Sequence, residues 1–135
     1  MKLQVYKEKE LTFKNADTAT ISINTAGCLV LNSATIFLLG ITDKSKVVLA
    51  QDSEEKKDWY IAVDDKNGVP LKPFGKDKLG WQGKSIANKI IGSCDLPEYA
   101  SSVLFRVSEE GFDLGGITYY PIITFKPMRV NRVRS

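Results

Sequence analysis

The sequence contains no histidine and only two cysteines among its 135 residues. Without histidine the chain cannot assemble Ser-His-Asp or Cys-His catalysis, an HExxH zinc site or any imidazole metal ligand. Two cysteines cannot supply the four thiolates of an all-cysteine zinc site. A GxxxxGK[ST] loop and a GxGxxG motif after a strand are also missing. These absences predict a protein that is not an enzyme and that holds no metal or cofactor.

Patterns for membrane insertion and secretion are missing as well. No run approaches the roughly 18 apolar residues of a membrane-spanning helix, and residues 1–13 lack the apolar core of a signal peptide. Cys28 and Cys94 lie far apart in the chain, which is typical of reduced thiols in a cytoplasmic protein. We therefore expect a cytoplasmic protein that does not contact membranes. Cys28 is expected to be a small buried residue of an apolar strand.

Acidic and basic residues are nearly balanced, because 19 basic and 16 acidic side chains give a formal net charge of +3. This value alone does not indicate nucleic-acid binding, but the basic residues are concentrated in two segments. Residues 66–89 contain six lysines and one acid, and the tail 126–135 contains no acid. Two interpretations stay open: a solvated loop with a frayed tail, or a surface that binds phosphate groups. In the second interpretation the nucleic-acid-binding residues are Lys72, Lys76, Lys78, Lys84, Arg129, Arg132 and Arg134.

Alternating and continuous apolar runs predict a mainly β protein with two short helices, in the α+β class. Strands are expected over residues 19–24, 28–31, 46–50, 58–63, 102–107 and 117–125. The first helix follows Asn32 or Ser33, either of which can cap its free amides, and it ends at Gly40. In the second helix Ser85 and Gly92 are expected to take the corresponding roles.

The segments between these elements carry turn residues. Asp65–Gly68 is expected to turn through a positive φ at its Asn-Gly pair. Glu109–Gly116 contains three glycines and is expected to be a turn region. Pro70–Gly83 is rich in Pro, Gly and Lys, which is typical of an irregular loop. Pro121 is expected to place the last strand at a sheet edge or a bulge.

The two helical segments indicate a possible internal repeat. Ser33–Gly40 and Ser85–Gly92 agree in their first serine, their apolar pair and their last glycine, and each precedes a hydrophobic strand, an acidic turn and an aromatic strand. Chance similarity and true duplication both explain this agreement. We expect one compact domain, a small barrel or paired-hairpin fold. Its β-α-β-β halves would be residues 19–68 and 81–125, joined by the Pro/Gly/Lys-rich loop and followed by the basic tail 126–135.

The segment Gly27–Leu49 resembles the AbrB-like, swapped-hairpin DNA-binding fold. Gly27 matches the glycine that opens the first strand of that family, and Leu39-Gly40-Ile41 matches the end of its helix. Residues 46–49 match the Val-rich strand that follows. Members of the family are DNA-binding regulators or antitoxins that work as intertwined dimers. The resemblance therefore implies a DNA-binding dimer.

Departures from the family pattern leave two hypotheses for function. Cys28 and Ile36 stand where the family has arginines, so its DNA-contacting residues are not carried over. The first hypothesis is a non-enzymatic nucleic-acid-binding, regulator-like module whose central lysines and tail arginines contact phosphates. The alternative is a structural or protein-interaction module of a mobile element or assembly, without DNA binding. It would bind a second copy or a protein partner through an exposed strand edge at Ile117–Phe125.

Overall fold

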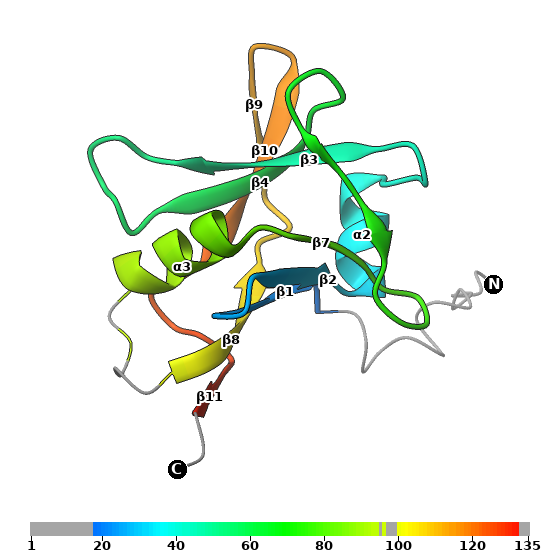
Figure 1. The fold of residues 1–135 in the computed structure, drawn as a ribbon. Coiled ribbons are helices and arrows are strands. Elements are labelled where there is room, and N and C mark those ends of the chain that lie inside the picture. Colours follow the sequence, from blue (N-terminus) through cyan, green and yellow to red (C-terminus); the bar gives the residue numbers. More distant parts are fainter. Residues whose placement is uncertain (1–17, 95, 97–99, 133–135) are drawn as a thin grey trace, which may run out of the picture.

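The computed structural model describes residues 18–94, 96 and 100–132, which contain two helices and eleven strands (Figure 1). The helices are α2 (Ser33–Leu39) and α3 (Lys84–Ser93). The first strands are β1 (Thr20–Asn24), β2 (Cys28–Leu31), β3 (Lys46–Gln51), β4 (Trp59–Val63), β5 (Val69–Pro70) and β6 (Lys72–Pro73). The others are β7 (Leu79–Gln82), β8 (Ala100–Val107), β9 (Phe112–Leu114), β10 (Ile117–Ile123) and β11 (Arg129–Arg132). The mainly β class with two helices is confirmed.

All eleven strands belong to one antiparallel sheet that curves into a nearly closed barrel. The order of neighbouring strands is β5-β3-β4-β10-β8-β1-β2-β7-β6. The two end strands, β5 and β6, are separated in the sequence by Leu71 alone, so the chain itself joins the ends of the sheet. β11 pairs with β8, and β9 forms with β10 a hairpin that projects from the barrel (Figure 1).

The hydrophobic core fills the inside of the barrel. Side chains of a strand alternate between the two faces of the sheet, and the buried residues of β1, β2 and β8 follow this period. The largest fully buried side chains include Trp59, Phe105, Ile21, Ile23, Leu29, Leu31, Ile61 and Ile90. Trp81 of β7 joins them with an exposed fraction of 7%. The segment 70–83, expected to be a loop, is therefore anchored in the core.

Helix α2 forms as the sequence predicts, and its N-terminal cap also fixes the start of β1. The side-chain oxygen of Asn32 accepts hydrogen bonds from the Thr35 amide at 3.0 Å and from the Thr20 amide at 3.1 Å. The hydroxyl of Thr35, a fully buried residue, lies 2.8 Å from the Thr20 carbonyl oxygen and donates to it. Gly40 ends the helix in the left-handed conformation. Both ends of this short helix are thus held, which its length requires.

The second helix begins and ends differently from the prediction. α3 follows Gly83, which makes no side-chain capping bond, and Ser85 lies within the first turn. Gly92 lies inside the helix, which continues to Ser93. The buried side chains of Ala87 and Ile90 hold α3 against the barrel, so packing takes the place of a side-chain cap. The capping roles predicted for Ser85 and Gly92 are therefore wrong.

Three segments predicted as loops contain strands. Pro70–Gly83 includes β6 and β7, Glu109–Gly116 includes β9, and the tail 126–135 includes β11. These strands are two to four residues long. β6 and β7 contain Lys, Pro and Gly, which are typical of turns, so strand formation there depends on the partner strand and not on local preference.

The predicted sheet edge at Ile117–Phe125 is wrong. β10 lies inside the sheet, paired on one side with β4 and on the other with β9 and β8. Pro121 stands opposite Tyr60, and its carbonyl oxygen accepts a hydrogen bond from the Ser108 amide at 2.8 Å. Among the described strands β9 pairs with β10 alone, so β9 is the edge on this side of the molecule.

The two halves of the chain contribute to the barrel in the same way. β1 corresponds to β5 and β6 together, β2 to β7, β3 to β8 and β4 to β10. When each strand is exchanged for its counterpart and the two ends of the sheet are joined, the same pairs of strands are neighbours. The halves meet at the turn 64–68, which lies before the predicted junction at 70–83. A single chain thus supplies both halves of the barrel. Sequence duplication stays a prediction, and this strand order is the one that a duplication would produce.

Candidate nucleic-acid interface

The outer face of six adjacent strands carries one continuous row of side chains. Following the registers from β6 through β7, β2, β1 and β8 to β11, its members are Lys72, Gly80, Val30, Ser22, Leu104 and Arg129. Register partners lie on the same side of a sheet, and neighbours along the strands, such as Leu29 and Phe105, are buried in the core. Strands lie roughly 4.8 Å apart, so Lys72 and Arg129 are separated by about 24 Å along the curved surface.

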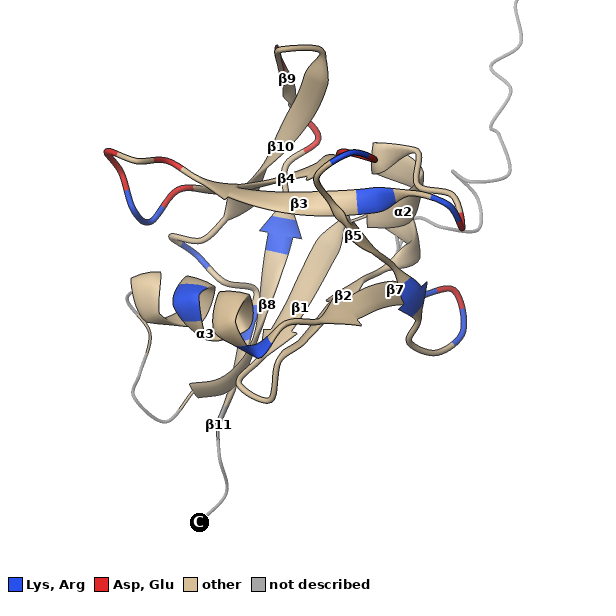
Figure 2. Cartoon of the chain, turned by 45° about the horizontal axis from the view of Figure 1, so that its top comes forward, with Lys and Arg blue, Asp and Glu red and all other residues tan. Residues whose placement is uncertain are grey.

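The six strands under this row contain no acidic residue, and we call their outer face the acid-free band. A second row on the band is uncharged and comprises Gln82, Cys28, Asn24, Ser102 and Asn131. The described carboxylates lie instead in turns, at hairpin tips and in β9 (Figure 2). An anion that approaches the band therefore meets cations at both ends and no carboxylate on its strands.

The band brings together three of the predicted nucleic-acid-binding residues. Lys72 and Arg129 are exposed at its two ends, and Lys78 is exposed where the chain enters β7. Lys76 is exposed in the turn between β6 and β7, beside Asp77. Lys72, Lys76 and Lys78 thus lie around the β6–β7 hairpin, and Arg129 lies at the other end of the row.

The other predicted residues lie elsewhere. Lys84 is exposed at the first position of α3, where Gly83 donates a 2.8 Å hydrogen bond from its amide to the Gly27 carbonyl oxygen. Arg132 belongs to β11 and pairs with Ala100. Arg134 lies outside the described residues.

Two residues of the band were not recognised in the sequence. Arg106 is exposed on β8 as the register partner of Thr20, on the face opposite to the buried Phe105. The alternation of buried and exposed positions in β8 is the signal that could have revealed it. Cys28 is half-buried on the outer face between Asn24 and Gln82, so the core position predicted for it is wrong.

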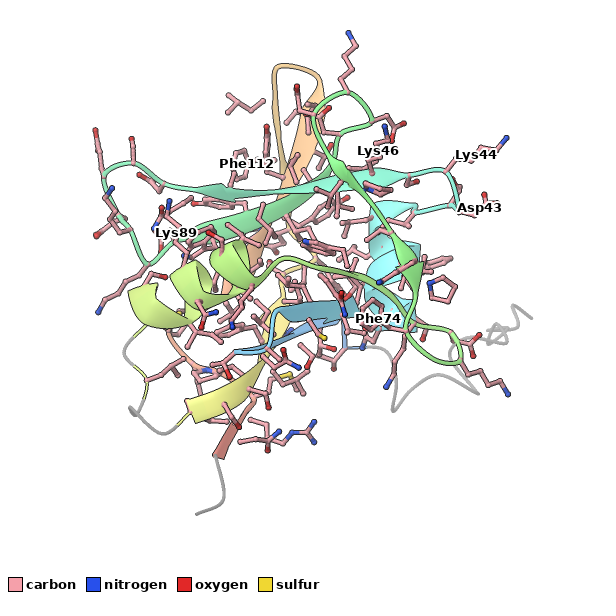
Figure 3. All side chains as sticks on the ribbon, viewed as in Figure 1. Asp43, Lys44, Lys46, Phe74, Lys89 and Phe112 are labelled. Carbon is pink, nitrogen blue, oxygen red and sulfur yellow. The ribbon has the colours of Figure 1, made fainter. Side chains whose placement is uncertain are left out.

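An aromatic ring holds the Lys72 end of the band in place. The Lys72 ammonium nitrogen lies 5.5 Å from the centre of the Phe74 ring, within the range of a cation–π interaction. Phe74, labelled in Figure 3, lies across Gly80, where an added Cβ atom would come within 3.1 Å of a ring carbon. The same Cβ atom would lie 2.3 Å from the Leu29 carbonyl oxygen, so the close approach of β2 also requires glycine at this position.

A groove opens beside this end of the band, between α2 and the hairpin formed by β6 and β7. Its volume is about 820 Å³. Its apolar lining comprises Ile36, Phe37, Ile41, Pro73 and Leu79, and its polar lining includes Ser33, Asp77 and Lys78. The Phe37 side chain is 73% exposed at the groove. Lys78 lines the groove and directly precedes β7, so the groove lies next to this end of the band.

The acidic turns are organised by local hydrogen bonds that lie outside the band. The pKa of Asp64 is lowered, first by the Asn67 amide, then by the Asn67 side chain, and also by the amide and charge of Lys66. Hydrogen bonds from the Glu54 and Glu55 amides lower the pKa of Asp52. Both carboxylates thus stabilise turns and are not poised for acid–base chemistry at neutral pH.

The described residues also bear on metal binding and membrane insertion. In the part of the chain that the structure describes, no three His, Cys, Asp or Glu side chains gather in a way that could hold a metal ion. Within the same residues, neither helix is long and apolar enough to span a membrane.

Comparison of the chain with protein-family models, curated proteins and solved structures gives no match. The resemblance of Gly27–Leu49 to the AbrB-like fold therefore stays a prediction. Two of its local features agree with the structure: residues 39–41 end a helix, and residues 46–49 begin a strand.

Proposed function

We propose that this protein is a non-enzymatic DNA-binding module that contacts phosphate groups through the acid-free band. The observation that carries this proposal is the row from Lys72 to Arg129, which crosses six strands without an acidic residue. Lys78 and Arg106 add exposed cations on the same surface. Contacts between such cations and phosphates release counterions, and this release supplies most of the affinity of sequence-independent binding.

The test compares two variants that lose the same charge. The band variant carries glutamine at Lys72, Lys78, Arg106 and Arg129. The control variant carries glutamine at Lys44, Lys56, Lys66 and Lys89, which are exposed outside the band. We expect the band variant to bind labelled DNA at least about 100-fold more weakly than the wild type at 0.1 M salt. The control should lose less than about tenfold. Equal losses in the two variants would reject the band as the binding surface.

A second candidate function is protein interaction through the projecting β9–β10 hairpin. Phe112 and Leu114 of β9 are 43% and 65% exposed, although both are apolar. The Phe112 ring packs edge-on against Tyr60 at 5.4 Å and stacks on Tyr119 at 6.0 Å, which extends the apolar surface onto β4 and β10. Exposed apolar side chains on an edge strand favour pairing with another chain. Self-association that is abolished by Leu114→Glu in sedimentation experiments would support this function.

A further inference from the structure

A short loop beside the acid-free band exposes two large apolar side chains. Among the described residues Phe125 is the most exposed large apolar residue, at 84%, and Met128 is 51% exposed. Both belong to residues 124–128, which connect β10 to β11. Single apolar residues are common on protein surfaces, but two in one short loop indicate a contact site.

The loop interrupts the pairing along one edge of β8. Ile123 of β10 pairs with Arg106, and Arg129 of β11 pairs with Leu104. The five residues 124–128 therefore stand where a regular strand would have one. Extra residues in a strand bend it and change the direction of its side chains. The loop thus lies at the edge of the acid-free band, between Arg106 and Arg129.

Both ends of the loop are held by hydrogen bonds. The hydroxyl of Thr124, a residue that is 7% exposed, donates to the Lys57 carbonyl oxygen. The Met128 amide donates to the Leu104 carbonyl oxygen at 2.8 Å. Pro127 further restricts the backbone between these bonds, because its ring fixes φ. The exposed side chains are therefore presented in a preorganised position, which lowers the entropic cost of binding a ligand.

The charges beside the loop favour an anionic ligand. Residues 124–131 include Lys126 and Arg129 and no acidic residue. Lys126, Arg129 and Arg106 are all exposed. Cations of this kind attract the phosphates of nucleic acids. Many proteins that bend DNA insert apolar side chains such as Phe and Met between base steps, next to basic residues that hold the backbone.

We infer that Phe125 inserts between neighbouring base pairs of duplex DNA bound to the acid-free band and kinks the duplex at that step. This inference rests on the proposed function and adds the form of the nucleic acid and the way in which it is deformed. Lys126 and Arg129 hold phosphates beside the opened step, and Met128 adds apolar contact.

The first test compares Phe125→Ala with Phe112→Ala. The control also removes an exposed ring, but from β9, which lies at the opposite end of the molecule from β11 (Figures 1 and 2). The probe is a duplex of about 30 base pairs, much shorter than the persistence length of about 150 base pairs. It carries a donor and an acceptor dye at its ends and is prepared with and without one central mismatch.

The wild type should bend both duplexes and thus increase the energy transfer between the dyes. Because a mismatched step costs less to unstack, the wild type should bind the mismatched duplex at least about fivefold more tightly than the intact one. Phe125→Ala should lose both effects and keep the salt dependence of binding, since its phosphate contacts remain. Phe112→Ala should behave like the wild type. Thermal unfolding checks that each variant is folded.

A second variant reports on insertion directly. Trp59 and Trp81 are only 2% and 7% exposed, so the tryptophan introduced by Phe125→Trp is the one that meets the ligand. Intact duplex should quench its emission. A blue shift with phosphatidylserine vesicles and no response to DNA would place the loop at a membrane surface and refute the inference.

The outcomes separate this inference from the proposed function. If the wild type binds duplex without bending it and without preferring the mismatch, or if Phe125→Ala keeps both effects, the inference is wrong while the band remains a DNA-binding surface. If a single strand of the same sequence binds more tightly than the duplex, the assignment to duplex is wrong. If neither form of DNA binds at low salt, the inference and the proposed function both fail.

Discussion

Replacing Asn32 by alanine should cost far more stability than replacing its neighbour Ser33. The Asn32 side-chain oxygen accepts from the amides of Thr35 and Thr20, at 3.0 and 3.1 Å. Loss of the helix cap costs about 1 kcal/mol. The Thr20 amide belongs to a residue that is 8% exposed, and leaving a buried donor unpaired costs about 1–3 kcal/mol. The Thr35 hydroxyl can still donate to the Thr20 carbonyl oxygen, so it adds little to the loss.

The expected destabilisation of Asn32→Ala is therefore about 3 kcal/mol, which corresponds to a fall in Tm of roughly 10 °C for a chain of this size. Chemical unfolding followed by tryptophan fluorescence measures it, because Trp59 and Trp81 are buried. Asn32→Asp keeps the accepting oxygen and should lose less than about 1 kcal/mol. Ser33→Ala should be nearly neutral. A loss below 1 kcal/mol for Asn32→Ala, or an equal loss for Ser33→Ala, would refute the role of Asn32 in joining β1 to α2.

Four further predictions concern stability and reactivity. Gly68→Ala should destabilise by about 2 kcal/mol or more, because its Cβ atom would lie 2.5 Å from the Asp64 carbonyl oxygen and 2.7 Å from the Val47 nitrogen. At Gly92, inside α3, an added Cβ atom meets open space, so Gly92→Ala should stabilise the protein by about 0.5–1 kcal/mol. Equal unfolding midpoints for Gly68→Ala and Gly92→Ala would contradict the predictions for both glycines. Because the pKa of Asp64 is lowered, the contribution of its carboxylate to stability is complete above its ordinary pKa of 3.8 and is lost as the pH falls through the lower folded value. The stability difference between wild type and Asp64→Asn should therefore shrink between pH 5 and pH 2. A constant difference would speak against this linkage. Burial raises the pKa of Cys94, so iodoacetamide at pH 8 should alkylate it more slowly in the folded protein than in guanidinium, as peptide mass spectrometry can show.

Local sequence signals predicted the first half of the fold well. β1, β2, β3 and β4 lie within one residue of the expected strands, because each carries a clear apolar pattern. Asn32 and Gly40 are the residues that bound α2. The turn at Asp65–Gly68 also forms, but Gly68 has no positive φ. Glycine is needed there because the backbone passes close to β3, a contact that the sequence cannot reveal.

Non-local pairing explains what the sequence missed. β6 and β7 lie in a segment of turn-forming residues, and they become strands because β2 and the barrel closure supply their partners. The same pairing creates the candidate site. Lys72 and Arg129 were selected for their charge alone, whereas the row that connects them depends on five strand registers. Arg106 was missed because a single arginine in an apolar strand has no charged neighbours in the sequence.

The most direct measurement is the salt dependence of duplex DNA binding by the wild type, the band variant and the control variant. Each phosphate contact on duplex DNA adds roughly 0.9 to the steepness of the slope of log affinity against log salt concentration. Four contacts from Lys72, Lys78, Arg106 and Arg129 therefore predict a wild-type slope of about −3.6 or steeper, which the band variant should flatten by about that amount. The control variant should keep the wild-type slope. Equal slopes in the wild type and the band variant would contradict phosphate binding by the acid-free band.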